Sequence, residues 1–189
     1  MKHVFSSVAI SALLCMAISP AIAHEAHVHG VGKLDVAIDG AQITLHLDTP
    51  LINLLGFEHP AKNTKDRAAA QKMALQLRNA SKLFVTTPAA ECRPISVKLA
   101  SNAIDPILLG ETPTPATKIN ANAKTKAAEH ADLEADIVLQ CENPNLLKTI
   151  DVNLFTKFKG FQKIDVQMVT PKNQLAATLR PSATLLSWE

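Results

Sequence analysis

The chain of 189 residues contains no tyrosine, and aromatic side chains make up only 4% of it. It also lacks any motif that pairs a nucleophile with a general base, and it shows no other catalytic signature. These absences argue against an enzyme. An excess of one charge is lacking too, because beyond residue 23 there are 18 basic and 17 acidic residues. This balance gives no electrostatic reason to expect a nucleic acid or an anionic membrane as partner.

Long apolar runs are absent apart from one near the N-terminus. Lys2, an apolar run over residues 4–18 and the small residues Ala21 and Ala23 follow the order of a cleavable secretion signal. We therefore predict that residues 1–23 are a signal peptide and that the mature protein is periplasmic. No later segment reaches about 18 uninterrupted apolar residues, so we expect no stable membrane insertion.

Cysteine is scarce, with three in the chain, of which Cys15 belongs to the predicted signal peptide. The other two, Cys92 and Cys141, predict a disulfide in an oxidising compartment. The alternative is a pair of thiolate metal ligands, but their spacing is unlike the Cys-x-x-Cys pattern of such sites.

Histidines, in contrast, are concentrated where the predicted mature chain begins. Residues 24–30, His-Glu-Ala-His-Val-His-Gly, place three imidazoles within six residues. Imidazole is the commonest protein ligand of zinc and copper. His27 and His29 would point to the same side of an extended segment and could share one ion. Cleavage before His24 would expose its amine beside its imidazole, which would make a copper-binding protein or copper enzyme the alternative.

Regular spacing of apolar residues predicts the fold. Apolar residues alternate in 34–38 and in 43–47 around Asp39-Gly40, which predicts a β-hairpin. Residues 51–55 predict a short helix that Gly56 would end. Apolar residues recur every three or four positions in 64–84, which predicts one long amphipathic helix. Alternation predicts further strands at 95–99, 130–141, 150–154, 164–169 and 175–179.

Strands with inserted helices, in no regular alternation, favour an α+β fold. We predict a single α+β domain over residues 31–189, with a mainly antiparallel sheet and the long helix packed on it. Residues 111–128 contain Thr-Pro-Thr-Pro and almost no large apolar side chain, so we expect a flexible linker there.

Metal-binding side chains also occur beyond the N-terminal segment. His59 precedes Pro60, which favours an extended conformation, and the adjacent Glu58 carboxylate could bind the ion or orient an imidazole. His130 opens the strand predicted at 130–141, whose polar side is acidic. Three imidazoles with a carboxylate or water would satisfy a four-coordinate zinc site. The candidate metal ligands are His27, His29, His59 and His130, and beside them His24, His46, Glu58, Asp132 and Glu134.

Each candidate also has a purely structural interpretation. The N-terminal histidines could belong to a tail that picks up metal incidentally. His59 could bond a backbone carbonyl, and His46 and the acidic residues 132–136 could form the solvated side of a half-buried sheet. A metal-independent adaptor of the cell envelope is therefore another alternative.

Several motifs resemble those of one protein family. His-Val-His-Gly at 27–30, a hairpin, Pro-Leu-Ile-Asn-Leu-Leu-Gly-Phe-Glu-His-Pro at 50–60 and a helix follow the order found in the zinc-regulated ZrgA family of exported bacterial proteins. The most specific motif is Gly-Phe-Glu-His at 56–59. The C-terminal half is similar to the family too, in segments 129–134, 141–144, 150–155 and 164–167.

The resemblance implies a periplasmic zinc-binding protein that captures zinc and delivers it to an ABC-type importer, and it implies no enzyme. By their positions in the motifs, it implies His27, His29, His59 and His130 as zinc ligands. Many relatives carry a long His/Asp/Glu-rich run ahead of the residue matching His130, whereas residues 111–128 contain no histidine. We therefore do not expect high-capacity zinc buffering.

Overall fold

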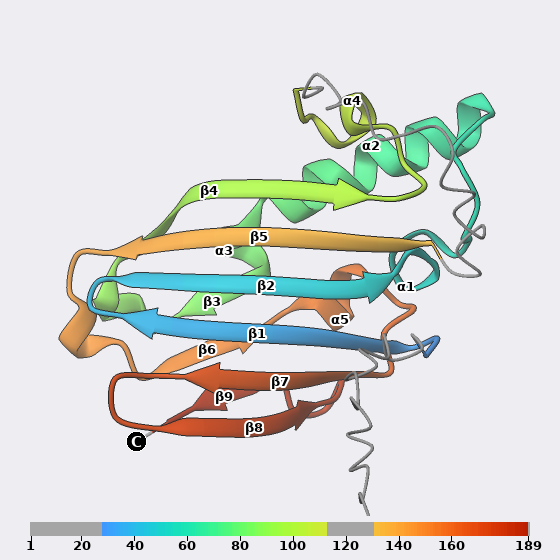
Figure 1. Ribbon diagram of the computed structural model, residues 1–189. Helices are drawn as coiled ribbons and strands as arrows, with labels where there is room; N and C mark the ends of the chain where they lie inside the picture. Colours follow the sequence, from blue (N-terminus) through green and yellow to red (C-terminus); the bar gives the residue numbers. More distant parts are fainter. Residues whose placement is uncertain (1–27, 113–130, 189) are drawn as a thin grey trace, which may run out of the picture.

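The computed structural model describes residues 28–112 and 131–188 (Figure 1). Its main element is a six-stranded sheet in the order β4-β5-β2-β1-β7-β8. Neighbouring strands are antiparallel except for β1 and β7, which are parallel. The strands of this sheet are β1 (Val31–Asp39), β2 (Gln42–Pro50), β4 (Cys92–Ser101), β5 (Asp132–Cys141), β7 (Lys163–Val169) and β8 (Gln174–Leu179).

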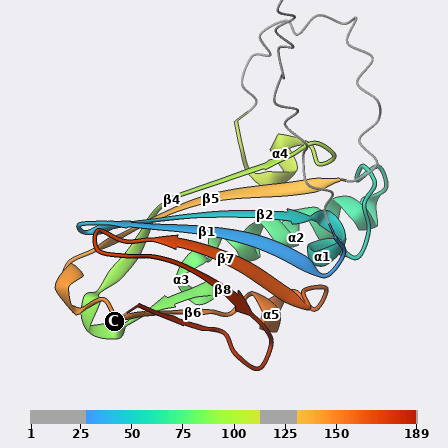
Figure 2. The ribbon, with the colours of Figure 1, turned by 60° about the horizontal axis from the view of Figure 1, so that its bottom comes forward.

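A second layer lies on one face of this sheet and leaves the other face open among the described residues (Figure 2). It contains a three-stranded sheet, β3-β6-β9, and four of the helices. The small strands are β3 (Phe84–Thr86), β6 (Thr149–Val152) and β9 (Leu185–Ser187). The helices are α1 (Leu51–Leu55), α2 (Thr64–Arg78), α3 (Ala80–Leu83) and α5 (Leu154–Lys157), while α4 (Pro106–Leu109) packs beside α2 and β4 at the sheet edge.

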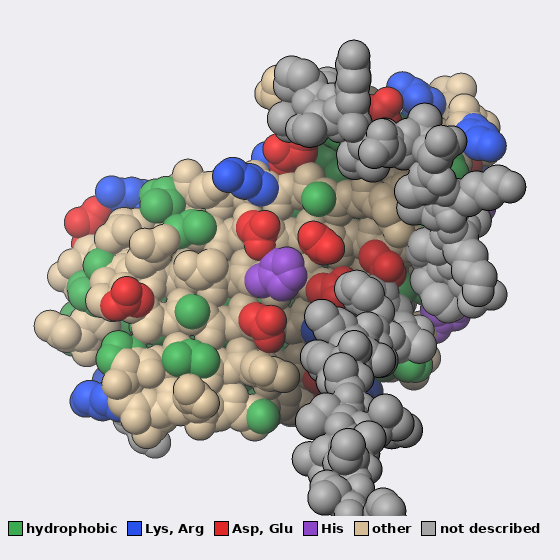
Figure 3. Space-filling view, in the orientation of Figure 1, with side chains coloured by type: hydrophobic (Ala, Val, Ile, Leu, Met, Phe, Trp, Pro, Cys, Tyr) green, Lys and Arg blue, Asp and Glu red, His purple; other side chains and the backbone are tan. Residues whose placement is uncertain are grey.

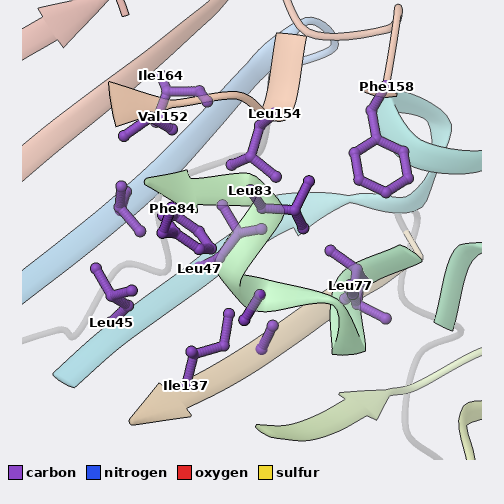
Figure 4. Close-up of a cluster of buried hydrophobic side chains, with 14 of the residues drawn as sticks. Leu45, Leu47, Leu77, Leu83, Phe84, Ile137, Val152, Leu154, Phe158 and Ile164 are labelled. Atoms are coloured by element: carbon purple, nitrogen blue, oxygen red, sulfur yellow. The ribbon is translucent and has the colours of Figure 1, made fainter. Parts of the chain in front are cut away.

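The hydrophobic core fills the space between the two layers (Figure 4). Leu45 and Ile137 of the large sheet face Leu77 of α2 and Phe84 of the small sheet, and each is at most 1% exposed. Burying a side chain of this size contributes roughly 1.5–3 kcal/mol. The strand predicted at 130–141 is confirmed over β5, whose alternate apolar residues are buried: Leu133, Ala135, Ile137, Leu139 and Cys141.

The predicted hairpin and short helix are confirmed. β1 and β2 pair antiparallel, and their turn is Gly40-Ala41, one position later than the predicted Asp39-Gly40. The short helix at 51–55 ends at Gly56, whose N–H donates to Ile52 O. The sequence pattern therefore located the turn and the short helix to within one residue.

The prediction of a single helix over residues 64–84 was wrong at its C-terminal end. α2 ends at Arg78, and Asn79 leaves the helical conformation with φ −84° and ψ 53°. Leu83, the last residue of α3, and Phe84, the first residue of β3 in the small sheet, both remain buried in the core. Apolar spacing therefore continued across a point where the helix itself stops.

Two predicted strands also differ from the structure. Leu154, expected to end a strand, begins α5. In β4 the pairing register shifts between Pro94 and Ser96, and Ile95 is 56% exposed. Proline cannot donate to a ladder, and such a bulge breaks the alternation of faces.

The predicted disulfide is confirmed. Strand pairing sets Cys92, the first residue of β4, opposite Cys141, the last residue of β5. Their sulfur atoms are bonded, with an S–S distance of 2.00 Å. The two cysteines are thereby engaged with each other and are not thiolate metal ligands.

Two predicted segments lie outside the described residues: the signal peptide at 1–23 and positions 113–128 of the linker. Glu111 is held by a hydrogen bond from Arg78 and by one from the N–H of Leu99. Within the described residues, no helix has the length and apolar character needed to cross a membrane.

Candidate metal centre

Three segments far apart in the sequence meet at one end of the large sheet. β2 runs directly into α1, and the N–H of Leu51 donates to the carbonyl of Ala131 at 2.7 Å. Ala131 immediately precedes β5, and Pro50 is paired with Asp132. The start of β1 lies at this same end, because β1 is antiparallel to β2. This end of the large sheet is therefore surrounded by three segments, residues 28–31, 51–60 and 131–132.

Asn53 of α1 holds the start of β1 in position. Its side chain is 2% exposed, and its Oδ1 accepts a hydrogen bond from the N–H of Gly30 at 2.7 Å. Its Nδ2 donates to Val31 O at 2.9 Å and to Thr49 Oγ1 at 3.0 Å. A buried amide with its partners satisfied ties the entering chain to the helix.

Residues just before β7 hold the same segment from the other side. The carbonyl of Gly30 accepts hydrogen bonds from the N–H groups of Gln162 and Lys163 at 2.7 and 3.0 Å. Gly160 approaches α1 so closely that a Cβ there would lie 2.5 Å from Asn53 O. A glycine is therefore required for this backbone contact.

His29 and Glu58 form a pair at this end of the sheet. Their Nε2 and Oε2 atoms are 3.1 Å apart, and their side chains are 56% and 17% exposed. Glu58 belongs to the loop after α1, whereas His29 precedes β1. The anchoring through Asn53 therefore sets the separation of these two side chains.

The ring of His59 is oriented by its neighbours. It stacks on Phe57 with centroids 4.5 Å apart, and its Nδ1 is 3.2 Å from Pro60 O. Nδ1 is also 3.8 Å from Asp66 Oδ2. When Nδ1–H donates to the carbonyl, the lone pair of Nε2 is available to a metal ion.

His46 lies on the open face of the large sheet, where Figure 3 shows a histidine among acidic side chains. Its Nδ1 is 2.7 Å from Asp136 Oδ1 on β5, and its other strand neighbour is Asp35 on β1. The hydrogen bond to Asp136, helped by the charges of Asp136, Glu134 and Asp35, raises the pKa of His46 above 6.5 although burial lowers it. An open hollow of about 300 Å³ here is lined by Lys33, Asp35, His46, Asp48, Asp165 and Gln167.

We expect Asp136→Asn to lower the pKa of His46, as measured by an NMR titration of its ring protons. Because the folded pKa lies above the unfolded value, the pair stabilises the fold at low pH, and this contribution is lost as pH rises through the folded pKa. Both side chains are more than a third exposed, so the loss at pH 5 should be below about 1 kcal/mol. An unchanged titration of His46 would contradict this assignment.

The structure brings only some of the predicted ligands together. His29, Glu58 and His59 belong to the segments at the end of the sheet, whereas His46 and Glu134 lie on the open face. Asp132 begins β5, and its N–H is bonded to Asn102 Oδ1. Three candidate residues lie outside the described part of the chain: His24, His27 and His130.

Within residues 28–112 and 131–188, no three His, Cys, Asp or Glu side chains converge as a metal site does. The ligand set predicted from the sequence therefore stays a prediction. Nothing among the described residues supports the copper alternative, which depends on His24.

Asn53 and Gly160 position the candidate site, and the sequence analysis missed both. Asn53 did leave a signal, since it is the one polar residue in Leu-Ile-Asn-Leu-Leu at 51–55. A polar side chain in such an apolar run must find buried partners. Gly160 gave no comparable signal, because its requirement arises from a contact with a distant helix.

Comparison with known proteins agrees with the motifs. The family model described as "ZrgA family zinc uptake protein" matches residues 26–188. The match spans every described residue and includes His27 and His130. No curated protein matches the chain.

Proposed function

The chain belongs to the ZrgA family of zinc uptake proteins, and on this premise we propose that it captures Zn²⁺ in the periplasm and hands it to an importer. The capture site that we propose lies at the end of the large sheet, where β1 begins and α1 ends. His29 and Glu58, which already form a pair, are its first two ligands, and binding of the ion would draw in His59 from the same loop as the third.

The observation that carries this proposal is the His29–Glu58 pair. Zinc binds histidine nitrogen and carboxylate oxygen at about 2.0–2.2 Å, so two donors of a tetrahedral ion lie about 3.4 Å apart. The 3.1 Å between Nε2 and Oε2 needs only a small adjustment to reach that separation. The zinc ion would take the place of this hydrogen bond, with the imidazole bound through Nε2 and the carboxylate through Oε2.

His59 suits the third position because of its tautomer. The Nδ1–H of His59 donates to a backbone carbonyl, which is how many zinc-binding histidines are oriented. A fourth position is open to water, to His27 or to His130. The last two are neighbours in the chain of Val28 and Ala131, which lie at this end of the sheet.

Exposure of the site favours transfer over permanent retention. His29 and His59 are each more than half exposed. Structural zinc sites are closed and commonly use thiolates, but both cysteines in the described residues are engaged in the disulfide. The disulfide in turn suits an oxidising compartment such as the periplasm. These features support a carrier that exchanges its ion.

Alanine at His29 or His59, or glutamine at Glu58, should each lower the affinity for Zn²⁺ at least about tenfold, or about 1.4 kcal/mol. Each change removes one donor from the shared ion. Calorimetric titration of the protein cleaved after Ala23, at pH 7.5, measures the loss. The same titration of His27→Ala and His130→Ala decides which of them fills the fourth position.

His46→Ala is the matched control, because this imidazole lies on the open face and is bonded to Asp136. Its affinity for zinc should equal that of the unaltered protein. If deletion of residues 24–29 abolished binding while Glu58→Gln and His59→Ala had no effect, zinc would be held by the N-terminal tail alone and the proposed site would be refuted.

A further inference from the structure

A hollow of about 250 Å³ lies between α2, α3 and α5, away from the open sheet face. Three of its lining residues are lysines, namely Lys72, Lys82 and Lys157, and none is acidic. All three are exposed, and their ammonium groups have no hydrogen-bond or ion-pair partner among the described residues. The hollow is therefore a concentrated and uncompensated positive site.

Some basic residues elsewhere in the described chain face an acid. Arg78 is paired with Glu111, and Lys163 is paired with Asp165. The hollow differs because three cations share it and no carboxylate lines it. Like charges gathered in this way repel one another unless an external anion compensates them.

Helix ends account for only part of this arrangement. Lys82 and Lys157 lie in the last turns of α3 and α5, where a positive charge is favoured by the helix dipole. Lys72, however, lies in the middle of α2, one turn before Leu75. Leu75 also lines the hollow and is 71% exposed. The helix dipole favours a positive charge at a helix end, and it gives no reason for an exposed apolar side chain.

We propose that this hollow is a docking site for an acidic segment of another protein. The carboxylates of that segment would meet the three lysines, and one of its apolar side chains would cover Leu75. The complementary charge is what selects such a partner. The acidic open face of the large sheet would repel the same segment and so steer it to the hollow.

A membrane surface fits this hollow less well. Proteins that lie on anionic lipid insert several apolar or aromatic side chains from a protruding face. Here a single exposed leucine accompanies the lysines, and the surface is concave. A folded-back peptide chain can enter such a hollow, whereas a flat bilayer cannot.

The hollow lies close to the proposed zinc site. Asp66, which lies near His59, is roughly 9 Å from Lys72 of the hollow, at 1.5 Å per residue along α2. A bound partner would thus sit beside the proposed zinc site. This consequence rests on the proposed function, but the docking site itself does not.

The test is an NMR titration of the ¹⁵N-labelled, zinc-free protein with the acetylated peptide Glu-Glu-Leu-Glu-Glu-Leu-Glu-Glu. We expect amide shifts at Lys72, Leu75, Lys82 and Lys157, and none with a peptide that has lysine in place of glutamate. The double variant Lys72→Glu/Lys82→Glu should weaken binding at least tenfold. Leu75→Ser should weaken it severalfold without any change of charge.

The matched control is Lys65→Glu/Lys172→Glu, which alters net charge equally at two exposed lysines outside the hollow. It should bind as the unaltered protein does. An equal loss in this control, or no shifts at millimolar peptide, would overturn the proposal. Binding to phosphatidylglycerol vesicles through Lys72 and Lys82, without binding of the peptide, would also overturn it and identify a lipid-binding surface. Because the protein is zinc-free in this titration and none of the proposed zinc ligands lines the hollow, loss of the zinc site leaves this result unaffected.

Discussion

Replacement of Cys92 and Cys141 together by alanine should lower the free energy of unfolding by about 4 kcal/mol. The disulfide joins residues 49 positions apart, and it restricts the unfolded chain strongly because the loop it closes is long. Domains of this kind are commonly stable by only about 5–15 kcal/mol. The variant should therefore fold at 25 °C but with a much reduced margin.

Urea unfolding followed by the fluorescence of Trp188 measures this change. Trp188 is the single tryptophan of the chain, and it packs against the core beside β9. The unaltered protein treated with a dithiol reductant is the control, and its midpoint should match that of the double variant. A loss below about 1 kcal/mol would mean that the unfolded chain is already held compact in this region.

Asn53→Ala should cost about 3 kcal/mol of stability, and it should also weaken the binding of zinc about tenfold. The change removes three hydrogen bonds and leaves the Gly30 N–H and the Val31 carbonyl without their buried partner. Because that segment leads directly to His29, the imidazole would lose its set position opposite Glu58.

A matched control separates the two effects of this substitution. Leu186→Ala empties a buried position in β9 of the small sheet and should cost a similar amount of stability. Its affinity for zinc should be unchanged at a temperature where both variants are folded. Equal loss of zinc binding in the two variants would show that Asn53 acts only through overall stability.

Elements whose burial follows a local repeat could be predicted from the sequence. The alternation in 133–141 was reliable because β5 has one face on the core and one face in solvent. The end of α2 could not be predicted in this way. Leu83 and Phe84 keep the helical spacing although Leu83 ends α3 and Phe84 begins β3, and this spacing did not show that Phe84 pairs with Val152 of β6.

The candidate metal ligands could be predicted from the sequence, but the residues that hold them in position could not. Imidazoles and carboxylates are recognisable from residue type, so His29, Glu58 and His59 could be named in advance. Their placement depends on Asn53 and Gly160, which contribute only through contacts with distant segments. The partner of His46 was missed for the same reason, because the pairing of β2 with β5 decides that Asp136 lies beside it.

The parallel pairing of β1 with β7 constrains the order in which a newly made chain can become functional. Synthesis delivers His29, Glu58 and His59 early, and the hairpin around them can form at once. Gln162 and Lys163, whose N–H groups donate to the carbonyl of Gly30, are made near the end of synthesis. A partially synthesised chain thus contains these three side chains but lacks the hydrogen bonds from β7 that orient them. We therefore expect the chain to bind metal only late in folding.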